Sequence, residues 1–111
     1  MKTNYQAGHD AERQAAEYLD SLGYKIRELN WKTRYCEIDI VAEKAGCIFF
    51  VEVKYRRNAA QGTGLEYVTS KKLKRMGFAA EMWVQGNQWP GAYQLAAVAI
   101  DVQQISFVDD L

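Results

Sequence analysis

Two acidic residues and a lysine stand inside otherwise apolar stretches of this sequence. Asp39 lies between two isoleucines, and Glu52 and Lys54 follow a continuous run of apolar residues. Successive side chains of a strand point to opposite faces, so Glu52 and Lys54 are expected on the same face. Carboxylates held together beside an apolar sheet need a compensating charge, and a hard divalent cation with oxygen ligands could supply it.

The sequence around these residues predicts a β-hairpin. Two segments rich in β-branched and aromatic residues, 36–43 and 47–57, flank a short break that contains Gly46. A loop of two or four residues at this break places Asp39 directly opposite Glu52, whereas a loop of three residues breaks this register. With either even-numbered loop, the two carboxylates become neighbours across the strands.

Such a pair predicts a metal site for phosphate chemistry. Asp39, Glu52 and the backbone carbonyl of Val53 could bind Mg²⁺ or Mn²⁺, because Mg²⁺ takes few protein carboxylates and keeps several waters. A bound metal lowers the pKa of a water ligand and neutralises charge on a phosphoryl oxygen. Lys54 could orient the attacking water or stabilise the charged phosphate. Glu12, near the start of a predicted helix, could supply a further ligand or hold a metal-bound water.

A purely structural interpretation of the same residues stays open at this point. Asp39 and Lys54 would then be surface residues at a strand end, and Glu52 would form an ion pair with Lys54. Glu12 would simply complement the dipole of its helix.

Length and composition bound the class of protein. The chain has 111 residues, which is typical of a single domain covering residues 1–111, and 49% of them are hydrophobic. The net charge is zero, so any contact with nucleic acid must come from a local basic patch. The two cysteines have no metal-binding spacing and no signal-peptide pattern is present, so we expect a reducing, cytoplasmic compartment. Apolar runs are too short to span a membrane.

Hydrophobic periodicity predicts alternating helices and strands in a mixed sheet. The expected elements are, in chain order, a helix over 7–22, strands over 24–31, 36–43 and 47–57, a helix over 71–85, and strands over 92–100 and 104–108. Asp10 could cap the first helix and Gly23 could end it, and Thr69 or Ser70 could cap the second. An apolar stripe running to Leu22 is expected to bury the first helix.

Basic residues cluster in two places that could contact phosphates. They follow the hairpin and lie on the second predicted helix: Arg56, Arg57, Lys71, Lys72, Lys74 and Arg75. Lysine and arginine neutralise backbone charge without reading sequence, which would suit nucleic-acid binding. The alternative for the helical group is an ordinary solvated face.

Several segments together carry a resemblance to known proteins. Asp39, followed by Glu52-x-Lys54, resembles the bipartite motif of the PD-(D/E)XK nuclease superfamily. The wider matching set comprises Gly8-x-x-Ala11-Glu12-x-x-Ala15, Leu19, Gly23-Tyr24, Asn30, Glu37-Ile38-Asp39-Ile40-Val41-Ala42, Phe50-Val51-Glu52-Val53-Lys54-x-Arg56 and Val68-Thr69-x-x-Lys72. This set resembles the YraN-type family of small bacterial endonuclease-like proteins, which is similar to archaeal Holliday junction resolvases.

The resemblance implies a fold and an activity. It implies an α/β fold with a restriction-endonuclease-like αβββαβ core, in which helices flank a mixed central sheet. It also implies metal-dependent cleavage of DNA, with branched or damaged DNA as a possible substrate. The chain departs from the family pattern at Cys36, where glycine is usual, and at Gln94-Leu95-Ala96, where Arg-Phe-Asp is usual.

Three functional hypotheses follow from the sequence. The first is a Mg²⁺-dependent or Mn²⁺-dependent nuclease acting on DNA. The second is a nucleic-acid-binding module without catalysis, which would use the basic residues together with Tyr55. The third is a protein-interaction domain, such as a homodimer joined through an edge strand or through the apolar segment 92–100.

Overall fold

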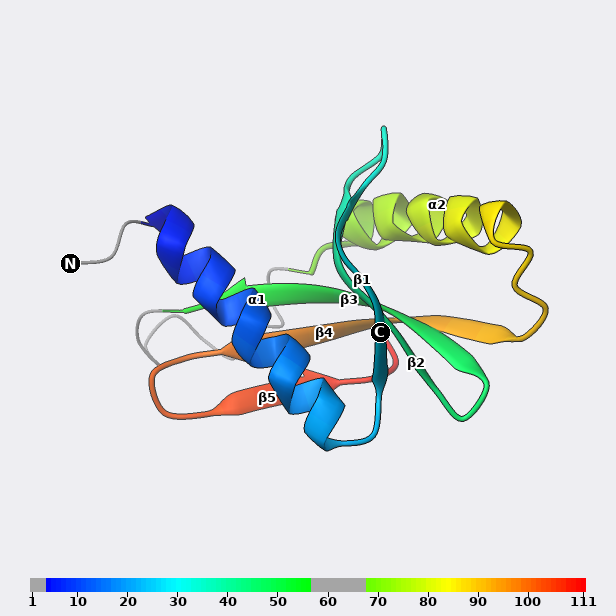
Figure 1. Ribbon diagram of the computed structural model, residues 1–111. Coiled ribbons are helices and arrows are strands. Elements are labelled where there is room, and N and C mark those ends of the chain that lie inside the picture. Colours follow the sequence, from blue (N-terminus) through cyan, green and yellow to red (C-terminus); the bar gives the residue numbers. More distant parts are fainter. Residues whose placement is uncertain (1–3, 57–67) are drawn as a thin grey trace.

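A computed structural model of the protein describes residues 4–56 and 68–111 (Figure 1). The elements are α1 (Asn4–Ser21), β1 (Lys25–Lys32), β2 (Glu37–Lys44), β3 (Cys47–Tyr55), α2 (Ser70–Gly86), β4 (Ala92–Ile100) and β5 (Ile105–Val108). This order confirms the expected α/β class and the restriction-endonuclease-like αβββαβ core, to which β5 adds an edge strand.

The strands form one mixed sheet in the described part of the chain. Their order is β1-β2-β3-β4-β5, and only the central pair β3 and β4 is parallel. Parallel neighbours need a crossover connection, and α2 lies in the connection between β3 and β4. The arrangement leaves β1 and β5 at the two edges and places β3 in the middle of the sheet.

A two-residue turn sets the register of the β2–β3 hairpin. Lys44 pairs with Cys47, so the loop consists of Ala45 and Gly46. Both loop residues have positive φ angles, 53° and 76°, as a type I′ turn requires. The even-numbered loop confirms the predicted register from this turn to the pair Ile40 and Val51, but the predicted pair of Asp39 with Glu52 does not follow it.

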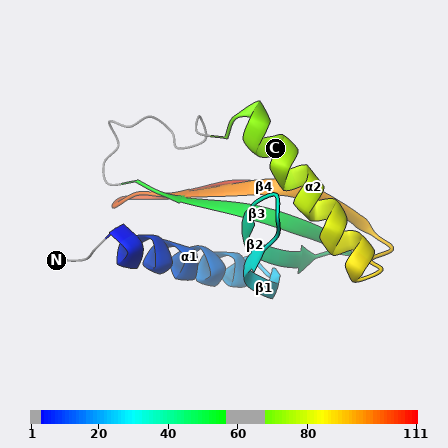
Figure 2. The same cartoon turned by 90° about the horizontal axis from the view of Figure 1, so that it is seen from above.

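The two helices cover opposite faces of the sheet (Figure 2). The core beneath α1 contains Ala11, Ala15, Leu19, Tyr24, Ile40, Ala42, Phe49, Val51, Ala96, Val98 and Ile100. The core beneath α2 contains Ile38, Val41, Ile48, Phe50, Met76, Ala79, Ala80 and Trp83. Strands buried on both faces need apolar side chains at nearly every position, which explains the unbroken apolar runs of β2 and β3.

The start and the end of α1 differ from the sequence prediction. The helix begins at Asn4, so Asp10 lies inside it and contacts Arg13 at 3.3 Å instead of capping the first turn. Gly23 follows the helix with φ at +93°, a conformation that suits glycine and ends the helix as expected. Leu22 lies beyond the last helical residue and is 40% exposed, because it no longer follows the buried stripe.

The apolar segment over residues 92–100 belongs to the interior. Its second half, Ala96 to Ile100, is buried in β4 between β3 and β5. This half therefore offers no exposed surface to a partner, whereas the edge-strand contact that the third hypothesis also named stays a prediction. No helix in residues 4–56 and 68–111 has the length and apolar character needed to cross a membrane.

Candidate active site

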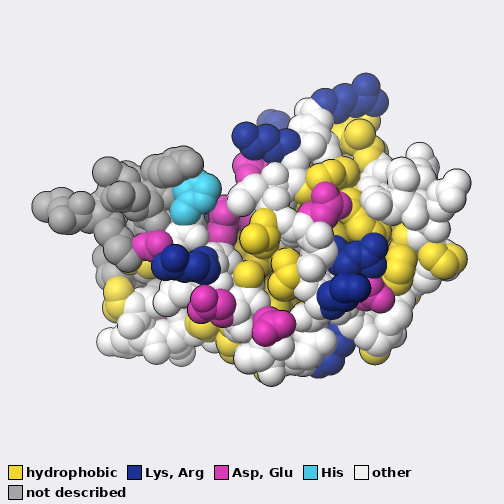
Figure 3. All heavy atoms as spheres, viewed as in Figure 1, with side chains coloured by type: hydrophobic (Ala, Val, Ile, Leu, Met, Phe, Trp, Pro, Cys, Tyr) yellow, Lys and Arg dark blue, Asp and Glu magenta, His cyan; other side chains and the backbone are white. Residues whose placement is uncertain are grey.

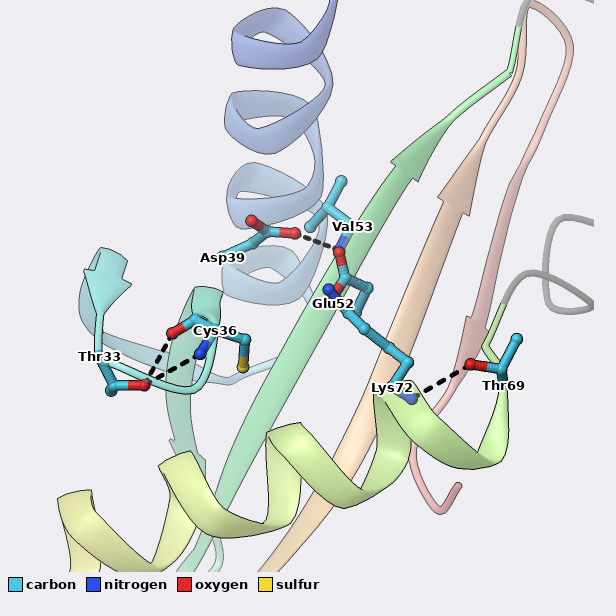
Figure 4. A network of polar contacts seen from close by, with 7 residues as sticks. All are labelled: Thr33, Cys36, Asp39, Glu52, Val53, Thr69 and Lys72. Atoms are coloured by element: carbon cyan, nitrogen blue, oxygen red, sulfur yellow. Dashed lines mark hydrogen bonds and ion pairs between the residues drawn. The ribbon is translucent and has the colours of Figure 1, made fainter.

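Strands β2 and β3 separate at Asp39. Their pairing ends with Ile40 and Val51, one step before Asp39 would meet Glu52. The Asp39 carboxylate Oδ2 instead accepts a hydrogen bond of 2.7 Å from the backbone N–H of Val53 (Figure 4). The amide and carbonyl of one strand residue point to the same side, so the Val53 carbonyl also faces the gap that Asp39 enters.

The two predicted carboxylates come together at this gap. Asp39 is 8% exposed and the Glu52 side chain 13%, and Figure 4 shows both near the Val53 amide. Burial, reinforced by the charge and a hydrogen bond of Glu52, raises the pKa of Asp39 to about 8, although the Val53 amide opposes the rise. Without a cation, this raised pKa favours the protonated form of Asp39. A bound cation would favour its ionised form.

Lys72 from α2 completes the centre of the site. Its Nζ lies 2.9 Å from Glu52 Oε2, whereas the sequence predicted phosphate contact and a supporting role for this side chain, and no ion pair with Glu52. Burial alone would lower the pKa of Lys72, but the hydrogen bond and charge of Glu52 raise it overall, with smaller contributions from Cys36 and Asp39. Lys72 is consequently a stable cation against the carboxylate pair.

The first turn of α2 fixes the backbone of Lys72. Thr69 is the N-cap, and its Oγ1 accepts a hydrogen bond of 3.1 Å from the Lys72 N–H. We expect Thr69→Ala to lower the free energy of unfolding by about 1 kcal/mol, because the Lys72 N–H in the first turn of α2 loses its acceptor. Chemical denaturation measures this change. Ser70→Ala, at the next residue, is the control and should change stability by much less; equal effects would contradict the capping role.

Glu12 reaches the border of the site from α1. Its Oε2 is buried and has no hydrogen-bond partner among the described residues, and His9 Nδ1 lies 3.8 Å away. Burial raises the pKa of Glu12, as do the charges of Glu37 and Glu52, whereas His9 and a hydrogen bond from Asn30 lower it. Glu12 thus offers a buried oxygen beside the carboxylate pair, as the supporting role requires.

Lys54 lies on the same side of β3 as Glu52. The regular pairing of Glu52 with Ala97 and of Lys54 with Ala99 preserves strand alternation over these residues. Lys54 is exposed, whereas Glu52 is partly buried. Its contact with an attacking water or a phosphate stays a prediction.

The basic residues predicted to contact nucleic acid fall into two groups. Lys71, Lys74 and Arg75 are exposed on α2, as phosphate contacts require. Arg56 differs, because it is 7% exposed and its Nη2 has no hydrogen-bond partner in the described parts of the chain. Its N–H donates to the Ile100 carbonyl at 2.8 Å, which continues the β3–β4 contact and holds Arg56 against the sheet. Arg57 lies outside the described residues.

Asn30 is a site residue to which sequence reasoning assigned no role. It has a φ of 53°, a left-handed conformation that asparagine tolerates better than most residues. Leu29 pairs with Ile40 and Trp31 pairs with Ile38. Asn30 on β1 therefore lies opposite Asp39 on β2. Its side chain hydrogen-bonds Glu12 and lowers the pKa of that carboxyl. The only sequence signal was its presence in the matching set.

Cys36 closes the turn that leads into β2. Figure 4 shows that its N–H donates to Thr33 Oγ1 at 3.1 Å and that its carbonyl accepts from the Thr33 hydroxyl at 2.9 Å. The same carbonyl also accepts from the Thr33 N–H at 3.0 Å. Burial raises the pKa of its thiol. The charge of Lys72 lowers this pKa, and the charge of Glu52 raises it. The cysteine that replaces the usual glycine therefore borders the site.

The oxygen donors fit a divalent cation that keeps water ligands. Asp39 and Glu52 supply two carboxylates, and Val53 supplies a carbonyl on the same side. Within the described ranges, no group of three or more His, Cys, Asp or Glu residues is arranged to hold a metal. Mg²⁺ sites commonly use one or two carboxylates with waters and substrate phosphates. The donor set therefore suits Mg²⁺ or Mn²⁺ that keeps several water ligands, and it does not suit a metal enclosed by protein ligands alone.

Comparison with known proteins identifies the family. A family model described as "Uncharacterised protein family UPF0102" matches residues 11–105. The chain belongs to this family. A UPF0102 protein of Cytophaga hutchinsonii is 36% identical over 100 residues, covering 90% of this chain and 88% of the relative. Another, from Sulfurihydrogenibium sp., is 36% identical over 106 residues, covering 95% and 92% respectively.

A third UPF0102 protein, from Pseudomonas fluorescens, is 34% identical over 105 residues and covers 93% of this chain and 88% of its own length. These matches confirm the predicted YraN-type resemblance across most of the chain. The UPF0102 name carries no reaction, so the chemistry must be argued from the site.

Proposed function

We propose that this UPF0102 protein is a Mg²⁺-dependent or Mn²⁺-dependent nuclease that hydrolyses phosphodiester bonds in DNA. The observation that carries the proposal is the meeting of Asp39 and Glu52 beside the Val53 backbone, at the point where β2 and β3 separate. Two buried carboxylates side by side are unfavourable without a compensating cation. Branched or damaged DNA is the substrate implied by the family resemblance.

Each side chain has a defined role in this proposal. Asp39, Glu52 and the Val53 carbonyl hold the cation, and Glu12 holds a water from the border of the site. The cation, when bound, lowers the pKa of a coordinated water and neutralises charge on the phosphate. Lys54 is exposed on the Glu52 side of β3, where it can stabilise the charged phosphate.

The surface around the site supports an anionic substrate. Lysine and arginine side chains lie over the projecting turn that joins β1 to β2, and the surface is hollowed between this turn and α1 (Figure 3). Acidic side chains are visible within this hollow, as a cation site would require. Exposed Lys71, Lys74 and Arg75 on α2 provide further positive charge.

Removing one of these exposed charges should weaken binding without regard to DNA sequence. We expect Lys74→Ala to reduce the slope of log affinity against log salt concentration by about 1, because one phosphate contact is lost. Fluorescence anisotropy in Ca²⁺ or EDTA, over a series of salt concentrations, measures the slope. Lys25→Ala, exposed at the edge strand β1, is the control, and an equal effect there would contradict a contact specific to α2.

The proposal is tested by incubating the protein with branched, nicked, duplex and single-stranded DNA. Cleavage is expected with Mg²⁺ or Mn²⁺ and is expected to stop in excess EDTA. A DNA-binding module without catalysis is the second candidate, favoured by the exposed cations of α2. That candidate predicts salt-dependent binding with no cleavage of any of these DNAs.

We also propose that the protein works in the cytoplasm, because of the state of its two cysteines. Cys36 and Cys47 are both free thiols, and cysteines without disulfides are typical of a reducing compartment.

A further inference from the structure

The ion pair between Lys72 and Glu52 occupies an oxygen that a metal would need. Lys72 Nζ lies 2.9 Å from Glu52 Oε2, which is buried and makes no hydrogen bond with the described residues beyond this ionic contact. Figure 4 shows the Lys72 side chain reaching from α2 toward Glu52, next to Asp39 and Val53. The ammonium therefore provides the positive charge that the metal-free carboxylates require.

We propose that the Lys72 ammonium is an internal competitor for the divalent cation: it neutralises Glu52 in the metal-free protein, gives up that oxygen when a metal binds, and thereby sets the metal affinity. This inference rests on the proposed function, because it concerns the same pair of carboxylates. It assigns to Lys72 a role in setting the metal affinity, in addition to any contact with DNA.

The structure allows the ammonium to leave without moving the helix. The backbone of Lys72 is fixed, since its N–H donates to Thr69 Oγ1 at 3.1 Å in the capped first turn of α2. Its side chain is 30% exposed, so part of it already contacts solvent. A lysine has four flexible carbons between backbone and charge, and the ammonium can therefore swing into water while α2 stays in place.

Competition of this kind has a definite thermodynamic consequence. A metal that binds Asp39 and Glu52 must break the Lys72 contact or share the Glu52 carboxylate with a neighbouring positive charge. Both possibilities weaken binding, because like charges a few ångströms apart repel strongly in a partly buried site. Removing the ammonium should therefore increase metal affinity, although the same removal leaves the metal-free carboxylates less well compensated.

Direct metal binding tests this inference without any need for catalysis. Free Mn²⁺ is measured by electron paramagnetic resonance during titration of wild type, Lys72→Met and Lys71→Met. The two variants lose the same formal charge from adjacent positions, but Lys71 is exposed and Lys72 contacts Glu52. We expect Lys72→Met to bind Mn²⁺ about tenfold more tightly than Lys71→Met. Equal or weaker binding by Lys72→Met would overturn the inference.

Two further variants separate this inference from the proposed site itself. Lys72→Arg keeps the positive charge and should not bind Mn²⁺ more tightly than wild type, and urea unfolding of Lys72→Met checks that this variant is folded. Asp39→Asn should lose most Mn²⁺ affinity in every background. If Asp39→Asn binds Mn²⁺ as wild type does, the proposed metal site is wrong; if only the Lys72→Met increase is missing, the competition alone is wrong.

Discussion

Replacing Asp39 by asparagine is expected to reduce metal-dependent DNA cleavage by about a thousandfold or more, because one of two anionic ligands is lost. The asparagine amide oxygen can still accept the hydrogen bond that the Val53 N–H gives to Asp39. The substitution also removes a buried ionisable group, so the fold should survive. Single-turnover cleavage of the preferred DNA in Mg²⁺ measures the loss.

The matched control is Asp110→Asn, which makes the same chemical change at an exposed residue near the end of the chain. It should leave the cleavage rate within about twofold of wild type, as surface substitutions rarely disturb a distant site. Cleavage by Asp39→Asn at the rate of Asp110→Asn would remove Asp39 from the chemistry. It would leave DNA binding without metal catalysis as the better explanation.

The stability of the metal-free protein should fall as the pH rises from about 4 to about 8. Asp39 has a pKa raised from 3.8 to about 8 in the fold, chiefly by burial and then by Glu52. Between these values the folded protein holds a proton on Asp39 that the unfolded chain has released. The contribution of Asp39 is therefore complete below the unfolded pKa and is lost as the pH passes through the folded pKa.

The size of this effect should be large enough to measure directly. Each pKa unit corresponds to about 1.4 kcal/mol, so the total is on the order of a few kcal/mol. Urea unfolding in EDTA, at several pH values, should show a steeper loss of stability in wild type than in Asp39→Asn. Added Mg²⁺ should reduce the loss at high pH, because the metal binds the ionised carboxylate. Parallel pH profiles for the two proteins would contradict the raised pKa.

Much of the site could be predicted because it depends on local rules. The break before β3 favoured a short turn, and the observed Ala45-Gly46 loop sets the register that brings Asp39 toward Glu52. The periodicity of α1 placed Glu12 at the edge of its apolar stripe, and the structure places a buried Glu12 oxygen at the border of the site. These features follow from strand alternation and helix geometry alone.

Other features depend on how distant elements pack, which periodicity does not determine. Lys72 lay at the margin of the helix stripe, and only the angle between α2 and β3 decides whether it contacts Glu52 or solvent. Arg56 was predicted to contact nucleic acid after the hairpin, but its hydrogen bond with Ile100 holds it inside. The left-handed conformation of Asn30, within a strand, has no propensity signal beyond the tolerance of asparagine.

The central claim is that Asp39 and Glu52 share one divalent cation. Anomalous diffraction from a crystal soaked in Mn²⁺ tests it most directly. The account predicts a peak bonded to a carboxylate oxygen of each residue, with the Lys72 ammonium displaced from Glu52 Oε2. A crystal in which Mn²⁺ binds elsewhere, while these two carboxylates keep their metal-free contacts, would contradict it.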